Sequence, residues 1–561
     1  MIRDAVDAVS AAGAGGGAGR AAERLRRAVA LMALLAVLHA FFRYLSRRSL
    51  FVAAREVEKE LRRRLFSHVI RLPLPFFQGT PTGDVMSRLA NDLSAVWLLL
   101  GPGVLMLTGT CITWLIAIVF MLEISPALTG LSLLVAPLVV VVSREYGRAF
   151  HRQHRGIQES LAAMNGTLQE NVTGIRLVKA FTLEEREEGR FGADCREYYR
   201  RSVAVARTSA KFHGAIGFLA GAGIALVLYF GGRSVIRGEL TLGGFVAFNA
   251  YLAMLAFPTM AMGWVINLFQ RGNAAMGRIN EYLRLPAELP EDAPGPPGGT
   301  PSPPPGAVSP PTCPILEVKG LVFSHEGGEK VLRGVSFALG KGEVTGLVGP
   351  TGCGKSTLLS LLAGLYAAPP GTIFWEGRDA VEIPLTERRG RVALVSQDPF
   401  LFSDTLLENI CFGKESPNPA AASEAARAAR LLDEIEEMPR GIETVVGERG
   451  ISLSGGQKQR ATIARALYGE RPVLLLDDAL SAVDSETERE IFEGILKASG
   501  EATVLFSTHR MASLSRCDRI LVLDEGRIVE EGTHDGLLSL RGRYFDLYSR
   551  QMLARELEEA T

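Results

Sequence analysis

A glycine-rich segment in the second half of the chain has the residue types of a phosphate-binding loop. It fits the pattern G-x-x-x-x-G-K-[ST] and consists of Gly349, Pro350, Thr351, Gly352, Cys353, Gly354, Lys355 and Ser356, followed by Thr357. Glycines let successive backbone N–H groups curl around a phosphate, Lys355 supplies a point charge to it, and the Ser356 hydroxyl suits Mg²⁺. The apolar run that ends at Val348 predicts a strand before the loop, and the residues from Thr357 to Leu365 predict a helix after it. This order of strand, loop and helix favours nucleotide binding over a chance match.

Two neighbouring aspartates follow a run of four apolar residues. The run extends from Val473 to Leu476, and Asp477 and Asp478 come directly after it. A buried parallel strand of this kind delivers a carboxylate to the carboxyl edge of its sheet, where ligands bind. We expect Asp477 to bind Mg²⁺ through water beside the phosphate loop. Together the two segments indicate nucleotide hydrolysis or nucleotide-gated motion.

A third segment predicts an anion site of a different kind. It consists of Leu453, Ser454, Gly455, Gly456 and Gln457, and a predicted helix from Lys458 to Tyr468 follows it. A serine hydroxyl and glycine N–H groups at a helix N-terminus attract phosphate oxygens, because the helix dipole leaves partial positive charge there.

With these three segments the chain resembles one half of an ATP-binding cassette exporter of the multidrug or lipid type. The segment 453–457 matches the signature motif of that family. Four further motifs occur in the family's order, at 395–399 with Gln397, at 446–450, at 481–484 and at 507–510 with His509. Residues 83–92 and 174–181 look like the family's two cytosolic coupling regions, so the resemblance covers nearly the whole chain.

The resemblance implies ATP and Mg²⁺ as cofactors and assigns roles to single residues. The residues concerned are Ser356, Gln397 and Asp477 for Mg²⁺, and Asp478, His509 and Gln397 for hydrolysis. ATP on the phosphate loop of one cassette would be closed over by residues 454–457 of a second cassette. Closure on binding and release on hydrolysis would switch a cavity between the spans from inward-facing to outward-facing.

The composition is consistent with a membrane protein and excludes one other class. The 561 residues carry 61 Lys and Arg against 61 Asp and Glu, so the net charge is zero and no charge-driven binding to nucleic acid is expected. A hydrophobic fraction of 47% and a mean hydropathy of +0.17 are too apolar for soluble domains alone. Five largely uncharged runs predict membrane spans. They start at Ala28 (a weaker run, interrupted by Arg43), cover 93–122 and 124–143, and lie between Lys211 and Arg233 and between Glu239 and Arg271.

Charge and proline content predict the domain organisation. Two arginine-rich stretches, 55–92 and 144–211, alternate with the spans and are expected on the cytosolic side. Prolines crowd the segment 286–314, which predicts an extended linker. We therefore predict a multidomain chain. It has an all-α transmembrane helical domain at 1–284, a Pro-rich linker at 285–314, an α/β P-loop nucleotide-binding domain at 315–550 and a tail at 551–561. The protein is expected to be multi-pass in the cell membrane, with the nucleotide-binding domain in the cytoplasm.

Asp478 is the departure from the family pattern that matters most, because the family usually has glutamate there. The shorter side chain withdraws the carboxylate by about one bond length, and a catalytic base must reach its proton within about 2.6–3.2 Å. We expect slow hydrolysis at this chain's own loop, which favours the degenerate-site subunit of a heterodimer. The retained His509 and Gln397 keep open a homodimer in which Asp478 works adequately.

Two further departures concern the adenine contact and the span count. His325 stands where the family usually stacks tyrosine on adenine, and its smaller ring predicts modestly weaker binding, with a plain loop histidine as the alternative. The family half has six spans against the five predicted here. Residues 1–9 look like the tail of a first span and 10–27 like an outward loop, so we expect further residues upstream of Met1.

The sequence thus predicts an ATP-driven export translocase for a drug-like or lipid-like molecule. It would work in the lipid bilayer as a dimer with a second half-transporter, by alternating access, with no nucleic-acid partner. Two alternatives stay open, a nucleotide-regulated and weakly hydrolytic subunit of a heterodimeric transporter and an importer that shares the exporter fold.

Overall fold

A computed structural model of the chain describes residues 3, 6–7, 18–289, 313–325, 327–447, 453–481, 483 and 485–559. They form two compact units, each drawn from two parts of the chain. The helical unit comprises Met1–Leu65 and Met86–Tyr282, and the sheet unit comprises Phe66–Val85 and Leu283–Thr561. Most of the predicted first-span tail (1–9), the predicted loop from 10 to 17 and the linker residues 290–312 lie outside the described residues.

Helices make up the helical unit, and α4 begins in the residues of the sheet unit. In chain order the helices and turns are α2 (Ala18–Val69), α4 (Thr82–Ser87), the π-helical turn η1 (Arg88–Asp92), α5 (Leu93–Leu98), the π-helical turn η2 (Leu99–Gly103), α6 (Val104–Ile124), α7 (Pro126–Thr173), α8 (Ile175–Ala180), α9 (Glu184–Ile236) and α10 (Leu242–Leu283). Among the described residues, four stretches are long and apolar enough to cross a membrane, and a shorter apolar stretch begins α10. They are Leu25–Val69, Thr82–Ile124, Pro126–Thr173 and Glu184–Ile236, with Leu242–Leu255 as the shorter one. The predicted loop residues 18–27 are helical, because α2 begins before the predicted first run.

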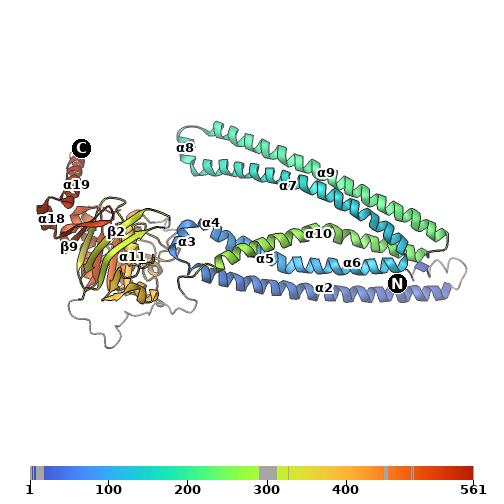
Figure 1. The fold of residues 1–561 in the computed structure, drawn as a ribbon, viewed down its shortest axis with the longest axis horizontal. Coiled ribbons are helices and arrows are strands. Elements are labelled where there is room, and N and C mark those ends of the chain that lie inside the picture. The colour runs from blue at the N-terminus through green and yellow to red at the C-terminus, as the bar shows by residue number, and fades with distance from the viewer. Residues whose placement is uncertain are drawn as a thin grey trace, which may run out of the picture. The chain divides into compact units, whose positions relative to one another are not determined.

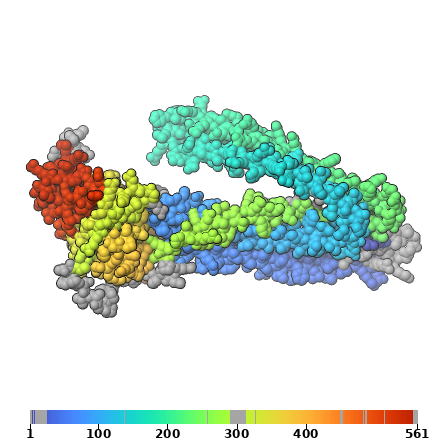
Figure 2. All heavy atoms as spheres, in the orientation of Figure 1, coloured from blue at the N-terminus to red at the C-terminus, as the bar shows by residue number. Residues whose placement is uncertain are grey.

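Helices α7 and α9 form an antiparallel hairpin with α8 at its tip, while α2, α6 and α10 run side by side (Figure 1). The chain reverses into α7 at Ser125, whose side chain accepts a hydrogen bond from the Leu128 N–H at 3.3 Å, and Pro126 follows at the first helical position. Thr167 on α7 donates to Asp194 on α9 at 2.8 Å. Figure 2 shows that the hairpin diverges from α6 and α10 toward its tip at α8, with open space between them.

The helix from α4 to α6 is interrupted by its two π-helical turns, the second of which contains Pro102. It packs closely on α10, since a side chain at Gly272 would come within 2.6 Å of the Leu99 side chain. Six residues further along α10, Arg278 donates to both oxygens of the buried Asp92 carboxylate, at 2.9 and 2.5 Å. A bidentate pair of this kind fixes the two helices in register.

Two sheets organise the sheet unit. The smaller has the order β2-β1-β4-β5 and is antiparallel, and the larger has the order β10-β9-β3-β8-β7-β6 with parallel pairing from β9 to β6. The strands are β1 (Leu316–Ser324), β2 (Lys330–Leu339), β3 (Val344–Val348), β4 (Ile373–Trp375), β5 (Arg378–Asp379), β6 (Val392–Val395), β7 (Val473–Asp477), β8 (Thr503–Ser507), β9 (Arg519–Asp524) and β10 (Arg527–Gly532). The predicted architecture, a part of long apolar helices followed by an α/β part with a largely parallel sheet, is confirmed.

Helices and short helical turns complete the sheet unit. They are α3 (Leu74–Gly79), α11 (Lys355–Leu362), η3 (Ala380–Glu382), α12 (Leu385–Gly390), α13 (Leu406–Ile410), α14 (Pro419–Ala428), α15 (Leu432–Glu436), η4 (Gly441–Glu443), α16 (Gly455–Tyr468), α17 (Ser485–Ser499), η6 (Met511–Arg516), α18 (His534–Leu540) and α19 (Arg543–Glu559). The helix predicted from Thr357 to Leu365 thus begins earlier, at Lys355, and ends at Leu362.

Strand β7 shows how the larger sheet separates two apolar cores. Leu474 and Leu476 are buried in one core with residues of α16 and α17, whereas Val473 and Leu475 are buried in the other with residues of α11. Successive side chains of a strand point to opposite faces, so an uninterrupted apolar strand fills both cores. The burial on both faces makes β7 a rigid support for the aspartates at its carboxyl end.

Candidate functional site

The carboxyl edge of the parallel sheet gathers residues from four separate segments. In the register of the sheet, Leu347 pairs with Ser507, Asp477 also pairs with Ser507, and Val395 pairs with Leu476. The phosphate loop, the two aspartates, the segment with His509 and the segment with Gln397 all leave the sheet at this edge. This is where parallel α/β sheets bind ligands.

The phosphate loop turns tightly between β3 and α11, and glycine is required at two of its positions. A side chain at Gly349 would lie 2.0 Å from the Leu523 carbonyl oxygen, and one at Gly354 would lie 2.8 Å from the Leu332 side chain. Gly354 also has a φ of +109°, in the region that glycine adopts without strain. The loop therefore has the close backbone approach that a phosphate cradle needs.

Lys355 bends back over this loop. Its ammonium donates to the carbonyl oxygens of Gly349 at 2.8 Å and Pro350 at 3.0 Å. The positive charge thus lies on the inner side of the loop, where negative phosphate oxygens gain the most from it. Cys353 is buried beneath the same turn, and burial raises the pKa of its thiol while the Lys355 charge opposes that shift.

Asp477 is buried at the end of β7, next to the start of α11. Burial raises the pKa of its carboxyl group, and the neighbouring Ser356 hydroxyl and Lys355 charge act in the opposite direction. A hydroxyl and a carboxylate side by side are hard oxygen ligands of the kind that Mg²⁺ prefers. The donor set therefore fits a magnesium ion bound together with phosphate.

Asp478 forms a direct pair with His509. The Nδ1 atom of His509 lies 2.9 Å from Oδ1 of Asp478, and the Asp478 side chain is 14% exposed against 56% for His509. Burial raises the pKa of Asp478, an effect that the His509 charge opposes. The backbone at Asp478 is left-handed, with a φ of +48°, and its N–H donates to the Ser507 carbonyl oxygen at 2.9 Å.

The serine-glycine segment forms the N-terminus of α16 through a reciprocal cap. The Ser454 hydroxyl accepts from the Gln457 N–H at 3.2 Å, and the Gln457 side chain accepts from the Ser454 N–H at 2.8 Å. The Gln457 amide also donates to Glu434 at 2.7 Å. These two residues thus bond to each other and to Glu434 rather than to the phosphate loop of their own chain. Gly455 and Gly456 begin the helix between them.

His325 lies beside the first turn of α11, within a cluster of rings. Its Nε2 atom is 3.4 Å from the Thr357 hydroxyl, and its ring meets Phe323 and Tyr366 edge-on at 5.2 Å each. The sequence predicts His325 as a nucleotide contact but does not predict that Tyr366, 41 residues later, packs against it. The sequence indicates only that the two residues flank the predicted phosphate loop.

A buried charge that the sequence did not single out supports the segment 481–484. Glu488 is 2% exposed and accepts from Arg510 at 2.9 Å. The Arg510 guanidinium in turn donates to the carbonyl oxygens of Ser481 at 2.9 Å and Val483 at 2.6 Å. Because Arg510 follows His509 directly, this arginine ties the histidine segment to Ser481 and Val483. Of the motif residues, 448–450, Ala482 and Asp484 lie outside the described part of the chain.

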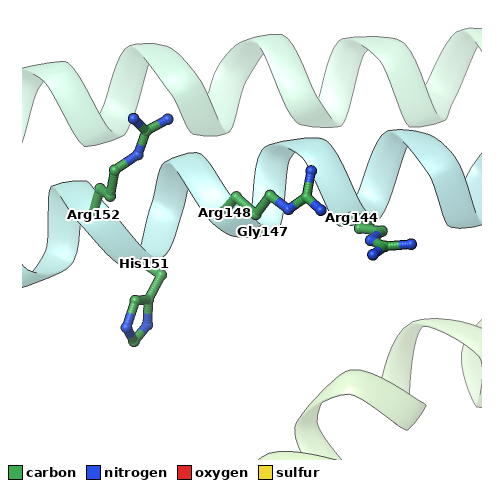
Figure 3. Close-up of a pocket in the computed structure, with 5 residues that line it drawn as sticks. All are labelled: Arg144, Gly147, Arg148, His151 and Arg152. Carbon is green, nitrogen blue, oxygen red and sulfur yellow. The ribbon is translucent and has the colours of Figure 1, made fainter.

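Away from the sheet, basic side chains line an open hollow of about 610 Å³ along α7 (Figure 3). The lining residues are Arg144, Gly147, Arg148, His151 and Arg152. Arg148 pairs with Glu145 at 2.8 Å. In Figure 3, Arg152 points toward α9 and His151 points away from it. We call these lining residues the basic stripe. It begins where the uncharged run 124–143 ends, at the expected boundary of a membrane span.

The chain matches two family models that between them cover most of its length. Residues 4–259 match the ABC transporter transmembrane region, and residues 332–481 match the ABC transporter family. The multidrug resistance-like ATP-binding protein MdlA of Escherichia coli is 36% identical over 520 residues, which is 92% of this chain and 86% of that protein. The ATP-dependent lipid A-core flippase of Syntrophus aciditrophicus is 33% identical over 496 residues, 88% of this chain and 80% of that protein. A solved structure of a bacterial Atm1-family ABC exporter with ATP bound has a TM-score of 0.75 at 28% identity, covering 98% of this chain and 94% of the other.

Proposed function

The chain belongs to the ATP-binding cassette transporter family, and on this premise we propose that it is the slower half of a heterodimeric exporter. Its membership makes the protein a multi-pass membrane exporter coupled to an ATPase. Exporters of this fold work as dimers in a membrane. The proposal adds that the partner is a different chain, which supplies the faster of two ATP sites.

The observation that carries the proposal is the pair of Asp478 and His509. The aspartate carboxylate is short, mostly buried and bonded at 2.9 Å to the histidine of its own chain. A general base has to come within about 2.6–3.2 Å of the attacking water, and a side chain one methylene shorter than glutamate stops about one bond length before it. This geometry supports the proposal of slow hydrolysis at this chain's own loop.

The residues around the loop divide the work of holding MgATP. The loop residues 349–357 would bind the phosphates through their N–H groups and Lys355, and His325 would lie against adenine. Mg²⁺ would be held by Ser356, by Asp477 through water and by Gln397, and when bound it neutralises charge on the phosphates. Asp478 would accept a proton from water, and His509 would hold the γ-phosphate and orient that water.

The intact segment 454–457 would serve the other chain. Its cap leaves the first N–H groups of α16 pointing outward with the helix dipole behind them, which favours a phosphate. In a head-to-tail dimer this helix start closes over ATP on the partner's loop. One chain can therefore combine a slow site of its own with a competent contribution to its partner's site.

Two exposed apolar surfaces support a second copy of this fold as partner. One is on α8 and the residue after it, where Ile175, Leu177 and Phe181 are exposed, and the other is on the sheet unit. The second consists of Phe400, Phe402 and Phe412, which are exposed, and the ring of Phe402 contacts both of the others. We propose that α8 of each chain lies on the aromatic surface of the other chain. Cysteines placed at Leu177 and at the matching aromatic position of the partner should then cross-link between chains, and cross-linking only within one chain would contradict the arrangement.

The experiment that tests the proposal is MgATP turnover by this chain purified alone in lipid nanodiscs. Nucleotide binding with little turnover is expected, and co-purification with the partner should restore turnover. Lys355→Ala provides the control for binding at this loop. Robust turnover of the chain alone, abolished by Lys355→Ala, would instead establish a self-sufficient homodimer.

The basic stripe on α7 favours an amphiphilic substrate with an anionic group within the drug-like or lipid-like class. Arg144 and Arg152 line its hollow, and no ion pair of theirs occurs among the described residues. Exchange of both for glutamine should reduce stimulation of ATP turnover by an anionic amphiphile and leave stimulation by its neutral analogue unchanged. Arg155→Gln is the matched control, because Arg155 is exposed on the same helix and paired with Glu159. Equal stimulation by both compounds in the unmodified transporter would contradict this substrate class.

We retain as a proposal the division of the chain at 284, 314 and 550. The proline content of 286–314 supports a linker there. A protease site inserted at residue 300 should release the nucleotide-binding part from the membrane, unless contacts of residues 66–85 with that part retain it. If the nucleotide-binding part is released after cleavage only in a variant that lacks the Gln78 side chain, those contacts are what retain it in the parent.

A further inference from the structure

The hydroxyl of Tyr366 bonds to a residue that precedes it by nearly three hundred positions. The Gln78 amide nitrogen donates to this hydroxyl at 2.7 Å, and the hydroxyl lies 3.0 Å from the Gln78 amide oxygen, to which it donates. Gln78 belongs to the six-residue helix α3, and both residues belong to the sheet unit. The contact is therefore internal to one compact body.

While its hydroxyl bonds to Gln78, the ring of Tyr366 contacts His325. The two ring centroids are 5.2 Å apart at an interplanar angle of 76°, and Phe323 completes the cluster at 5.5 Å from Tyr366. The Nε2 atom of His325 lies 3.4 Å from the hydroxyl of Thr357, in the first turn after the phosphate loop. Tyr366 thus touches the predicted adenine contact with its ring and α3 with its hydroxyl.

The burial of Tyr366 makes these two contacts dependent on each other. Its residue is 8% exposed and packs in the same apolar core as α11, with Leu74 of α3 against that core. An aromatic ring is covalently rigid, and the close-packed interior leaves little space around it. A displacement of His325 against this ring would therefore also act on the hydroxyl end of Tyr366 and on the amide bonded to it.

The position of α3 in the chain gives this movement a consequence. Helix α2 ends at Val69 and α4 begins at Thr82, so α3 lies on the only covalent path between two predicted membrane-spanning stretches. The segment just before α3 is also held within the sheet unit, since the Glu288 N–H donates to the Arg71 carbonyl oxygen at 2.8 Å. A shift of α3 would therefore act on the adjoining ends of α2 and α4.

We propose that Tyr366 is a positioning residue that reports occupancy of the adenine site to α3 through Gln78. The inference rests on the proposed function, which places adenine against His325. When a purine stacks on the imidazole, it fixes the orientation of that ring, and the edge-on contact fixes Tyr366 with it. The Tyr366–Gln78 bonds then order α3, so that nucleotide binding biases the membrane helices before any hydrolysis occurs.

The test is hydrogen exchange of the full chain in lipid nanodiscs, with and without Mg²⁺ and a non-hydrolysable ATP analogue. In the parent chain, nucleotide should slow exchange both in the loop 349–357 and in α3. Tyr366→Phe keeps the ring and removes the hydroxyl, so the analogue should bind within about threefold of the parent affinity. The slowing at α3 should be lost. Gln78→Leu should give the same result from the other side of the contact.

The matched control is Tyr544→Phe, which removes another tyrosine hydroxyl, one that is 2.7 Å from His534 Nδ1 in the same unit. It should leave the α3 response intact. Unchanged slowing at α3 in Tyr366→Phe would overturn the inference, as would an equal loss in the control. Nucleotide protection of the loop without any response at α3 in the parent would overturn it and leave the proposed function standing. Absence of protection at the loop itself would overturn both.

Discussion

Replacement of Asp478 by glutamate is the most direct perturbation of the proposed slow site. The side chain gains one methylene, which extends the reach of its carboxylate by roughly 1.5 Å, by ordinary bond lengths. The Nδ1 atom of His509 lies 2.9 Å from the aspartate oxygen, so the longer side chain has to rearrange this contact. We therefore expect Asp478→Glu to raise turnover at this chain's own loop.

The size of the increase follows from two opposing effects. Misplacement of a catalytic group by about 1 Å costs roughly 10²-fold in rate, which is about 2.7 kcal/mol of barrier. The backbone at residue 478 has a φ of +48°, and aspartate tolerates this left-handed conformation better than glutamate, by about 1 kcal/mol at most. The chain already holds Glu376 and Glu470 at a φ of +48°, so the conformation is accessible to glutamate. The net gain is about 1.7 kcal/mol, or roughly 20-fold.

The assay measures single-site turnover in the assembled transporter, with the partner's own phosphate-loop lysine replaced so that only this chain's loop hydrolyses ATP. Asp478→Asn provides the matched control, since it keeps the size and the left-handed preference of aspartate and removes the base. Its turnover should fall below that of the parent. Unchanged or lower turnover in Asp478→Glu would refute the reasoning, because the reach of the carboxylate would then not limit the rate.

Three further results are expected. Because burial raises the pKa of Cys353, little thiolate is present at neutral pH, so maleimide should label it slowly, faster as pH rises, and not at all with MgATP bound, with mass spectrometry as the readout. Glu488→Ala leaves Arg510 without its buried partner and should destabilise the sheet unit by about 3–5 kcal/mol. Glu493→Ala is the control, since Glu493 forms an exposed ion pair with Arg516. It should lower the free energy of unfolding by less than about 1 kcal/mol in thermal unfolding of the full chain. Burial also raises the pKa of Asp478 above its ordinary value of 3.8, so its base form is lost at a higher pH than usual; single-site turnover should fall on acidification while that of Asp478→Asn stays flat.

The sequence predicted the elements that carry a strong local signal. The short runs before Gly349 and before Asp477 are both strands. Such runs fit a parallel strand that is buried on both faces of its sheet. The glycines of the loop, the helix N-terminus after Leu453 and the uncharged runs of the spans are local features as well. All of them can be read without knowledge of the tertiary fold.

What the sequence did not predict depends on contacts between distant residues. The pairs Gln78–Tyr366 and Asp92–Arg278 join positions 288 and 186 residues apart, and neither has a periodic or compositional signal. The same limit explains why α3 was assigned by sequence to the transmembrane part at 1–284, whereas it packs with the sheet unit. Hydrophobic patterning gives the face that a helix buries but not the body against which it is buried.

Hydrogen bonds that link α16 to the backbone of Asp478 also decide which substitution of this residue is informative. Gln459 of α16 donates to the Ser481 hydroxyl at 3.0 Å, and this hydroxyl donates to the carbonyl oxygen of Asp478 at 3.0 Å. The helix that would serve the partner's ATP is thus bonded to the backbone of Asp478, not to its carboxylate. A change of side chain that keeps the left-handed backbone leaves this path intact, whereas a change that shifts the backbone disturbs both sites at once. Asp478→Glu and Asp478→Asn are of the first kind, so a difference in rate between them reports the base at this chain's own loop rather than an altered contribution to the partner's site.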